Sequence, residues 1–279
     1  MNIIRTVREM TAASAALKRD GKAVAFVPTM GALHEGHATL MRRARETGAA
    51  VVVSIYVNPT QFGPKEDFTK YPRTFDADCA ICKREGVAVV FAPTDAEMYP
   101  SGIASVSTWV DELQVAKRLE GERRPGHLRG VCTVVAKLFN IVQPDTAFFG
   151  QKDYQQLKVI ERMVRDLRYP IQIVTVPTVR EADGLAMSSR NRYLSPSERA
   201  KATVLSRALR AAGESGETDP LRLEAAMKEV IATVPEARLD YAEVVDGQTL
   251  ERIPHVRPGD VVLIAAFLGT TRLIDNVIL

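Results

Sequence analysis

Two histidines on either side of a glycine are the most chemically capable pair in this chain. His34 and His37 flank Gly36 within residues 28–37, which read PTMGALHEGH. An imidazole N–H can donate a hydrogen bond to a phosphate oxygen, and glycine lets a ligand approach the backbone closely. The pattern favours a phosphate-binding site, although two histidines can also simply cap a helix.

The elements around this pair support the first interpretation. The apolar run at residues 23–27 predicts a buried strand, and Leu40, Met41 and Ala44 recur at helical spacing just after the turn. Where a parallel strand is followed by a helix, the helix N-terminus offers unpaired N–H groups and partial positive charge. We therefore expect an anionic ligand at this turn.

Other candidate residues follow later strands. Lys152 comes just after a predicted strand and a glycine, which places it at the carboxyl edge of the same sheet. Gln61 lies in a polar segment after another strand, where it either contacts a substrate or is solvated. Hydroxyls and a cation stand together at Ser188, Ser189 and Arg190, a combination suited to holding phosphates.

Three further segments have less specific patterns. Residues 120–130, EGERRPGHLRG, predict either a phosphate contact or solvated charge before a helix. Residues 63–73 contain two prolines and little periodicity, which is typical of a flap over a site. Cys79 and Cys82 match a metal or redox spacing, but no second pair lies nearby, so we expect them to pack as small apolar residues.

The pattern of elements predicts an α/β fold with a Rossmann-like, doubly wound parallel sheet, because strands and helices alternate up to residue 176. The five predicted strands lie at residues 23–27, 51–57, 87–91, 146–149 and 171–176. After about residue 180 the pattern changes to helices followed by strands. We expect a Rossmann-like phosphate-binding domain over 1–179 and a smaller C-terminal α+β lid domain over 180–279.

The lid should begin with Ser195–Glu198, which read as a capping box. Its predicted helices span about 196–212 and 221–234, and its predicted strands span 240–245, 261–266 and 272–277.

Composition excludes several classes of protein. The chain has 279 residues, 46% hydrophobic and 25% charged, and its net charge of +3 is too small to predict a nucleic-acid partner. The N-terminus carries charge too early for a signal peptide, and no apolar run is long enough for a membrane span. We therefore expect a cytoplasmic protein. Three cysteines do not make a disulfide framework.

The candidate residues supply cations and amide donors, with no Ser/His/Asp order and no cysteine nucleophile. We therefore expect in-line attack of a carboxylate on the α-phosphorus of ATP, accelerated by positioning and by neutralising charge on the phosphates. Mg²⁺ would bridge the phosphates with few ligands from the protein, so we predict no protein metal site and no tightly bound organic cofactor.

The motifs carry a family resemblance over essentially the whole chain. His-x-Gly-His resembles the signature of the nucleotidyltransferase superfamily, and Met-Ser-Ser-Arg at 187–190 resembles the phosphate-holding loop of class I aminoacyl-tRNA synthetases. The longer motifs resemble the pantothenate synthetase (pantoate–β-alanine ligase) family. They are, in order, PTMGALHEGH, NPTQF, EGERRPGHLRGV, LFNIVQPD, FFGQKDYQQL and GLAMSSRN.

This resemblance implies a two-step ligation. ATP and pantoate form a pantoyl adenylate and release pyrophosphate, and β-alanine then displaces AMP to give pantothenate. The implied catalytic residues are His37, His34, Lys152, Ser188, Ser189 and Arg190. The implied ATP site is lined by Met30, Gly31, Ala32, Leu33, His34, Glu35, Gly36, His37, Gly150, Gln151, Lys152, Asp153, Val179, Met187, Ser188, Ser189 and Arg190.

Gln61 and Gln156 are the implied pantoate-binding residues, and their neutral amides suit a substrate with hydroxyl groups. The chain departs from the family at Gln151, where glutamate is usual, so that side chain receives no role. The resemblance also implies a homodimer with small-molecule substrates and no membrane partner.

Rival interpretations remain open on the motifs alone. A related adenylyltransferase would transfer AMP to a phosphorylated acceptor, which calls for an additional cationic pocket; the two glutamines argue against it. A tRNA-charging enzyme would need a basic accessory domain, but the C-terminal part is short and mixed in charge. A binding module without activity is disfavoured because every expected phosphate contact is present.

Overall fold

The computed structural model describes residues 1–64 and 66–279, which form two compact units. The first unit comprises Met1–Gly150 and Gln156–Val176, and the second comprises Gln151–Gln155 and Pro177–Leu279. Each unit has a hydrophobic core of its own. Among the described residues, no helix is both long enough and apolar enough to cross a membrane.

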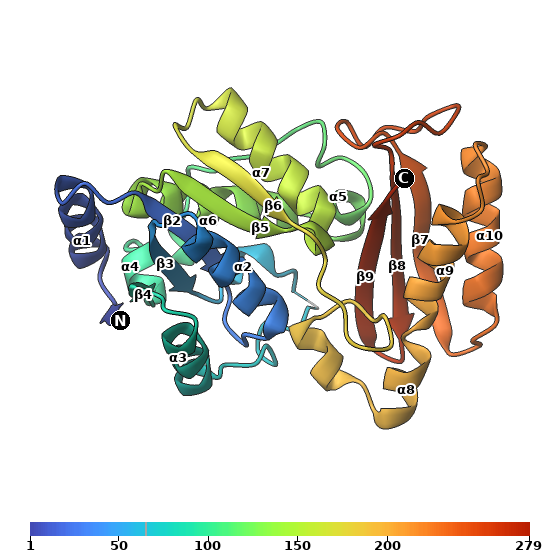
Figure 1. Cartoon of the computed structure of the whole chain (residues 1–279), viewed down its shortest axis with the longest axis horizontal. Helices are drawn as coiled ribbons and strands as arrows, with labels where there is room; N and C mark the ends of the chain where they lie inside the picture. The colour runs from blue at the N-terminus through green and yellow to red at the C-terminus, as the bar shows by residue number, and fades with distance from the viewer. Residues whose placement is uncertain (65) are drawn as a thin grey trace. The chain divides into compact units, whose positions relative to one another are not determined.

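A six-stranded sheet, all of whose pairings are parallel, forms the centre of the first unit (Figure 1). The strand order is β1-β4-β3-β2-β5-β6. The strands are β1 (Asn2–Ile4), β2 (Val24–Thr29), β3 (Ala50–Ile55), β4 (Val89–Phe91), β5 (Thr146–Gly150) and β6 (Gln172–Val176). From β2 the chain adds β3 and β4 on one side of that strand, and it then returns to add β5 and β6 on the other side. The strand order therefore reverses between β2 and β5. Ligands of open α/β sheets bind at such a reversal, beyond the carboxyl ends of the strands.

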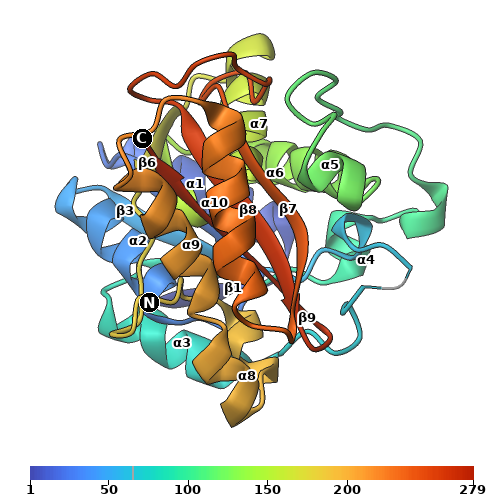
Figure 2. The ribbon, with the colours of Figure 1, turned by 90° about the vertical axis from the view of Figure 1, so that its right-hand side faces the viewer.

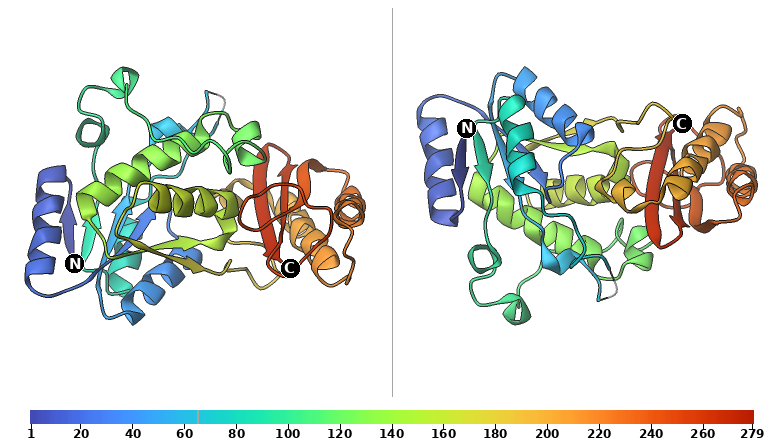
Figure 3. Two further views of the ribbon diagram at one scale, coloured as in Figure 1. Left: turned by 90° about the horizontal axis from the view of Figure 1, so that it is seen from above. Right: turned by 90° about the horizontal axis from the view of Figure 1, so that it is seen from below.

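Helices cover both faces of this sheet, as the two views of Figure 3 show. On one face Ala25 and Val27 pack in a common core with Leu40 and Met41 of α2. On the other face the ring of Phe26 meets Phe139 of α6 edge-on, with centroids 6.4 Å apart. The helices that contribute to this unit are α1 (Val7–Arg19), α2 (Glu35–Glu46), α3 (Phe75–Arg84), α4 (Asp95–Met98), α5 (Glu120–Arg123), α6 (His127–Val142) and α7 (Tyr154–Asp166). The predicted doubly wound parallel fold is confirmed.

The second unit is a three-stranded antiparallel meander of β7 (Ala237–Val245), β8 (Val261–Leu268) and β9 (Thr271–Ile278). Figure 2 shows α9 and α10 side by side against one face of this sheet. The helices of this unit are α8 (Pro196–Lys201), α9 (Val204–Gly213) and α10 (Pro220–Ala232). The predicted α+β composition and the capping box of Ser195 and Glu198 are confirmed.

β1 and the first helix of the second unit differ from the sequence-based expectation. β1 was not predicted, because three residues carry no periodic signal and become a strand only by pairing with β4, Asn2 opposite Val89. The helix predicted over 196–212 is two helices, α8 and α9. At the break Thr203 Oγ1 donates to the carbonyl of Ala200 at 3.0 Å, a local bond that competes with the helical ladder.

Candidate active site

The turn that joins β2 to α2 is held by a buried carboxylate from another element. Asp78, in the first turn of α3, accepts hydrogen bonds from the backbone N–H of Ala32 at 3.0 Å and of Leu33 at 2.8 Å. Its side chain is 1% exposed, and Thr74 Oγ1 donates to it at 3.0 Å. These bonds fix the backbone just ahead of His34.

The same turn contains two successive residues in the left-handed region. Gly31 has φ +80° and Ala32 has φ 51°. A Cβ at Gly31 would also lie 2.9 Å from Asp78 Oδ2, so this position needs glycine for both conformation and space. Thr29 Oγ1 donates to the carbonyl of Ser54 at 2.7 Å and accepts the N–H of Gly31 at 3.1 Å. The turn is thus tied to β3 as well as to α3.

His34 and His37 form a capping box at the N-terminus of α2. His34 Nδ1 accepts from the N–H of Gly36 at 3.2 Å, and His37 Nδ1 accepts from the N–H of His34 at 3.3 Å. A ring nitrogen that accepts carries no proton, so the neutral ring bears its proton on Nε2. Helix capping and phosphate binding are therefore compatible: Nδ1 caps the helix, and Nε2–H is the group that can donate to a phosphate.

Gln61 is buried at the end of a 3₁₀ turn, η1 (Pro59–Gln61), in the first unit. Its backbone carbonyl accepts from His127 Nδ1 at 2.9 Å. Burial, helped by the positive charge of Arg124, lowers the pKa of His127 to about 4. His127 is therefore neutral near pH 7 and supports the backbone of Gln61 instead of supplying a cation.

Arg124, from the same basic loop, makes two 2.8 Å hydrogen bonds to the carboxylate of Glu66. Glu66 lies in the segment 63–73 that was predicted to be a flap, of which residue 65 lies outside the described residues. The basic loop and the predicted flap are thus joined by a half-buried ion pair.

In the second unit Val179 and Met187 face each other, with the N–H of Met187 donating to the carbonyl of Val179 at 2.9 Å. The chain then enters η4 (Ser189–Tyr193), where Ser188 Oγ accepts from the N–H of Arg190 at 3.2 Å. The structure thereby brings together the residues of the predicted ATP site that come from this part of the sequence.

Neighbouring residues of β9 hold the two segments of the second unit that bear predicted ATP-site residues. Asp275 makes a bidentate ion pair with Arg180, at 2.6 and 3.0 Å. Asn276 Nδ2 donates to the backbone carbonyls of Gln151 at 3.0 Å and Lys152 at 2.9 Å, and the side chain of Gln151 donates back to Asn276 Oδ1 at 3.2 Å. The side chain of Gln151 therefore holds the lysine-bearing segment to the sheet.

The predicted site residues thus fall into two groups. The first unit carries Met30, Gly31, Ala32, Leu33, His34, Glu35, Gly36, His37, Gln61, Gly150 and Gln156. The second unit carries Gln151, Lys152, Asp153, Val179, Met187, Ser188, Ser189 and Arg190.

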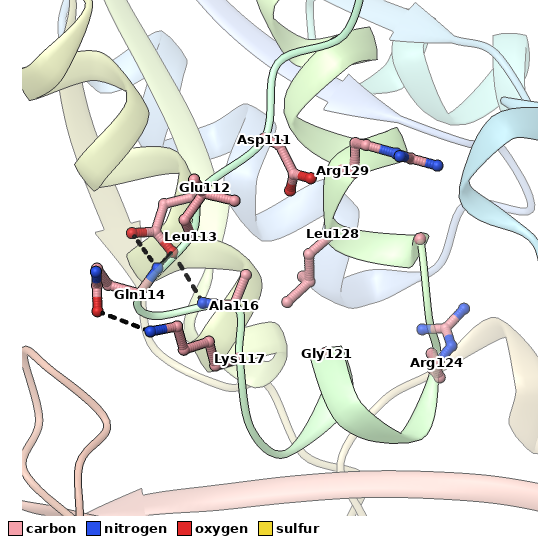
Figure 4. A pocket seen from close by; sticks show the side chains of 11 residues that line it. Asp111, Glu112, Leu113, Gln114, Ala116, Lys117, Gly121, Arg124, Leu128 and Arg129 are labelled. Carbon is pink, nitrogen blue, oxygen red and sulfur yellow. Dashed lines mark hydrogen bonds between the residues drawn. The ribbon is translucent and has the colours of Figure 1, made fainter.

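The described part of the first unit contains a small cavity beside the β2–α2 turn and a larger one elsewhere. One of about 330 Å³ is bordered by Met30, Gly31 and Asp78, beside the turn after β2. The other, of about 630 Å³, is lined by residues of the segment 111–129, and none of the predicted site residues lines it (Figure 4). Among the described residues, no group of three or more histidine, cysteine, aspartate or glutamate side chains is arranged to hold a metal ion.

Sequence reasoning missed the side chains that hold the site in place. Asp78 had a usable signal, because it lies one helical turn before the fully buried Cys82 and so shares the apolar face of α3. Asp275 and Asn276 are consecutive buried polar residues that interrupt the apolar part of β9, between Ile274 and Val277, which indicates specific partners for both.

Comparison with known proteins gives the identity of the fold. A family model described as pantoate-beta-alanine ligase matches residues 2–278. The chain belongs to the pantoate–β-alanine ligase family. It is 58% identical over 261 residues to the pantothenate synthetase of Acidobacterium capsulatum, covering 92% of this chain and 86% of that protein. It is 53% identical over 281 residues to that of Heliobacterium modesticaldum, covering 100% and 99%.

Solved structures of this family match the whole chain. The pantothenate synthetase of Thermus thermophilus has a TM-score of 0.93 at 48% identity, covering 99% of each chain. The Francisella tularensis pantoate-beta-alanine ligase, complexed with beta-gamma ATP and beta-alanine, has a TM-score of 0.83 at 32% identity, covering 100% of this chain and 97% of that one. The family resemblance of the motifs is confirmed, and the chain is a ligase that joins pantoate to β-alanine.

Substitutions can separate helix capping by the two histidines from the phosphate binding that we expect of them. His34→Asn and His37→Gln each keep a side-chain acceptor for the helix N-terminus but remove the imidazole Nε2–H. We expect both to keep the wild-type unfolding free energy within about 0.5 kcal/mol and to lose about 100-fold or more in turnover. His34→Ala, the matched comparison, should lose activity and also about 1 kcal/mol of stability. Full activity in His37→Gln would show that turnover does not need the imidazole Nε2–H of this residue.

Burial of His127 predicts acid sensitivity of the fold. Because its pKa is about 4 in the folded protein and 6.5 ordinarily, the unfolded chain binds more protons between these values. Stability is retained above the unfolded value and lost as the pH falls from 6.5 toward 4. This one group should cost about 2 kcal/mol of unfolding free energy between about pH 7 and pH 5.

His127→Gln is the control, because it keeps an N–H donor for the Gln61 carbonyl but does not titrate. The unfolding free energy is measured with urea at both pH values. Its decrease from pH 7 to pH 5 should be about 2 kcal/mol smaller in His127→Gln than in the wild-type protein. An identical pH dependence in the two proteins would contradict a neutral, buried His127.

Proposed function

We propose that the chain makes pantothenate from pantoate, β-alanine and ATP in two steps through an enzyme-bound pantoyl adenylate. A carboxylate oxygen of pantoate attacks the α-phosphorus of ATP, and the bond to pyrophosphate breaks. The amine of β-alanine then attacks the acyl carbon, AMP leaves with the bond electrons, and the attacking nitrogen loses a proton. The Francisella relative, solved in complex with beta-gamma ATP and beta-alanine, supports this choice of substrates.

The observation that carries the proposal is the histidine capping box of α2. With both Nδ1 atoms accepting backbone N–H groups, His34 and His37 are oriented as Nε2–H donors at a helix N-terminus, which itself favours an anion. We assign them to the phosphate oxygens of ATP and of the departing pyrophosphate. Donors fixed in advance lower the barrier because they need no reorganisation as charge develops.

The remaining roles follow from residue chemistry. Lys152 would neutralise charge in the transition state, and Ser188, Ser189 and Arg190 would hold the β- and γ-phosphates. Gln61 and Gln156 would bind pantoate. ATP would enter as its magnesium complex, so the metal comes with the substrate and is held mainly by phosphate oxygens.

We also propose the finer family properties for this chain. The chain divides near residues 179 and 180 into a substrate-binding domain and a lid domain. It forms a homodimer and works in the cytoplasm, where ATP is present. Sedimentation equilibrium tests the dimer, and a monomer at micromolar concentration would contradict it.

The reaction is tested by AMP release with ATP and Mg²⁺ supplied together with pantoate, with β-alanine, or with both. We expect multiple-turnover AMP release only with both, and exchange of labelled pyrophosphate into ATP with pantoate alone. Lys152→Ala should lower both rates about 100-fold or more without loss of fold. Pyrophosphate exchange that needs β-alanine would contradict an adenylate formed first.

A further inference from the structure

A chain of hydrogen bonds in the first unit ends on the side chain of Gln61. Asn58 lies at its centre and is 1% exposed. Its Nδ2 donates to Gln61 Oε1 and to the carbonyl of Gly130, both at 3.2 Å. Its Oδ1 accepts from the hydroxyl of Tyr99 at 2.7 Å and from that of Thr60 at 3.1 Å. Every hydrogen-bonding atom of the Asn58 amide group is therefore used.

The carbonyl of Gly130 determines the orientation of the Asn58 and Gln61 side-chain amides. A carbonyl only accepts, so the atom of Asn58 that faces it must be the NH₂ group. Oδ1 then faces Tyr99, whose hydroxyl must donate. The second N–H of Asn58 points at Gln61, so the nearer atom of that side chain must be its oxygen.

Met30 gives the same orientation independently. Gln61 Nε2 lies 2.9 Å from Met30 Sδ, and a thioether sulfur only accepts. The oxygen of Gln61 is thus directed toward Asn58 and its NH₂ group lies at the opposite end. One N–H is used on the sulfur, and the other can meet a substrate oxygen.

The hydroxyl that begins this chain is held firmly. Tyr99 is 3% exposed, and Lys137 Nζ lies 4.1 Å from its ring centroid. Burial raises the pKa of Tyr99, so the phenol keeps the proton that it donates. Gly130 approaches η1 so closely that a Cβ there would lie 2.3 Å from the carbonyl oxygen of Thr60. These contacts leave little room for the amides to rotate.

We propose that Tyr99 is a positioning residue of the acid-binding site. Through Asn58 it holds the amide of Gln61 with Nε2–H toward the substrate, so this position selects an acceptor oxygen on the acid. The inference rests on the proposed assignment of Gln61 to pantoate. An acid without an acceptor oxygen at this point would leave a buried N–H unpaired and would bind less well.

Tyr99→Phe tests the proposal with a readout that loss of packing alone would not give. We expect the KM for pantoate to rise about five- to tenfold, the effect of one buried hydrogen bond, while kcat and the KM for ATP change less than about twofold. Tyr169→Phe is the matched control, since Tyr169 precedes β6 at the amino edge of the sheet, away from the ligand edge. It should leave all three constants unchanged.

A double-mutant cycle then tests whether Tyr99 acts through Gln61. Gln61→Glu replaces the Nε2 amide group, which donates the hydrogen bond, with a carboxylate oxygen. Adding Tyr99→Phe to this variant should therefore change the KM for pantoate less than about twofold. Additive effects, an unchanged KM in Tyr99→Phe, or equal rises in the KM for pantoate and for ATP would each overturn the proposal. A wild-type protein that does not turn over pantoate would instead overturn the proposed function.

Discussion

The site depends on one buried carboxylate, that of Asp78. It accepts the N–H groups of Ala32 and Leu33 and so stabilises a turn in which two successive residues are left-handed. A non-glycine residue in this region is strained, and the strain persists only where surrounding contacts outweigh it. Because His34 follows directly, the position of the α2 N-terminus and of both imidazoles depends on this contact between α3 and the turn.

The same kind of support recurs at Gln61 and at the segment that bears Lys152. A buried polar side chain from a distant part of the sequence satisfies backbone groups of the segment that bears the functional residue. His127 does so for Gln61, and Asn276 does so for Gln151 and Lys152. Hydrogen bonds of this kind hold the backbone of these segments in one position. A ligase that works by positioning and charge neutralisation gains from donors fixed before the substrate arrives.

Local sequence patterns were sufficient for the parallel sheet and for the turn that bears His34 and His37, because periodicity and a strand–turn–helix order are local signals. They also predicted the capping box at Ser195. They failed where a long-range partner decides the outcome. β1 exists only through pairing with β4, and the roles of Asp78 and Asn276 lie in contacts 45 and 125 residues away along the chain. The tautomers of the two histidines likewise required the observed capping geometry.

The most direct test of this account is the affinity for ATP of Asp78→Asn, measured by titration calorimetry beside Asp76→Asn. Both variants remove one negative charge from the first turn of α3, but Asp76 is exposed and only Asp78 contacts the turn. We expect ATP to bind about tenfold or more weakly to Asp78→Asn, with the fold retained by circular dichroism, and normally to Asp76→Asn. Wild-type ATP affinity in a folded Asp78→Asn protein would contradict the claim that this carboxylate organises the site.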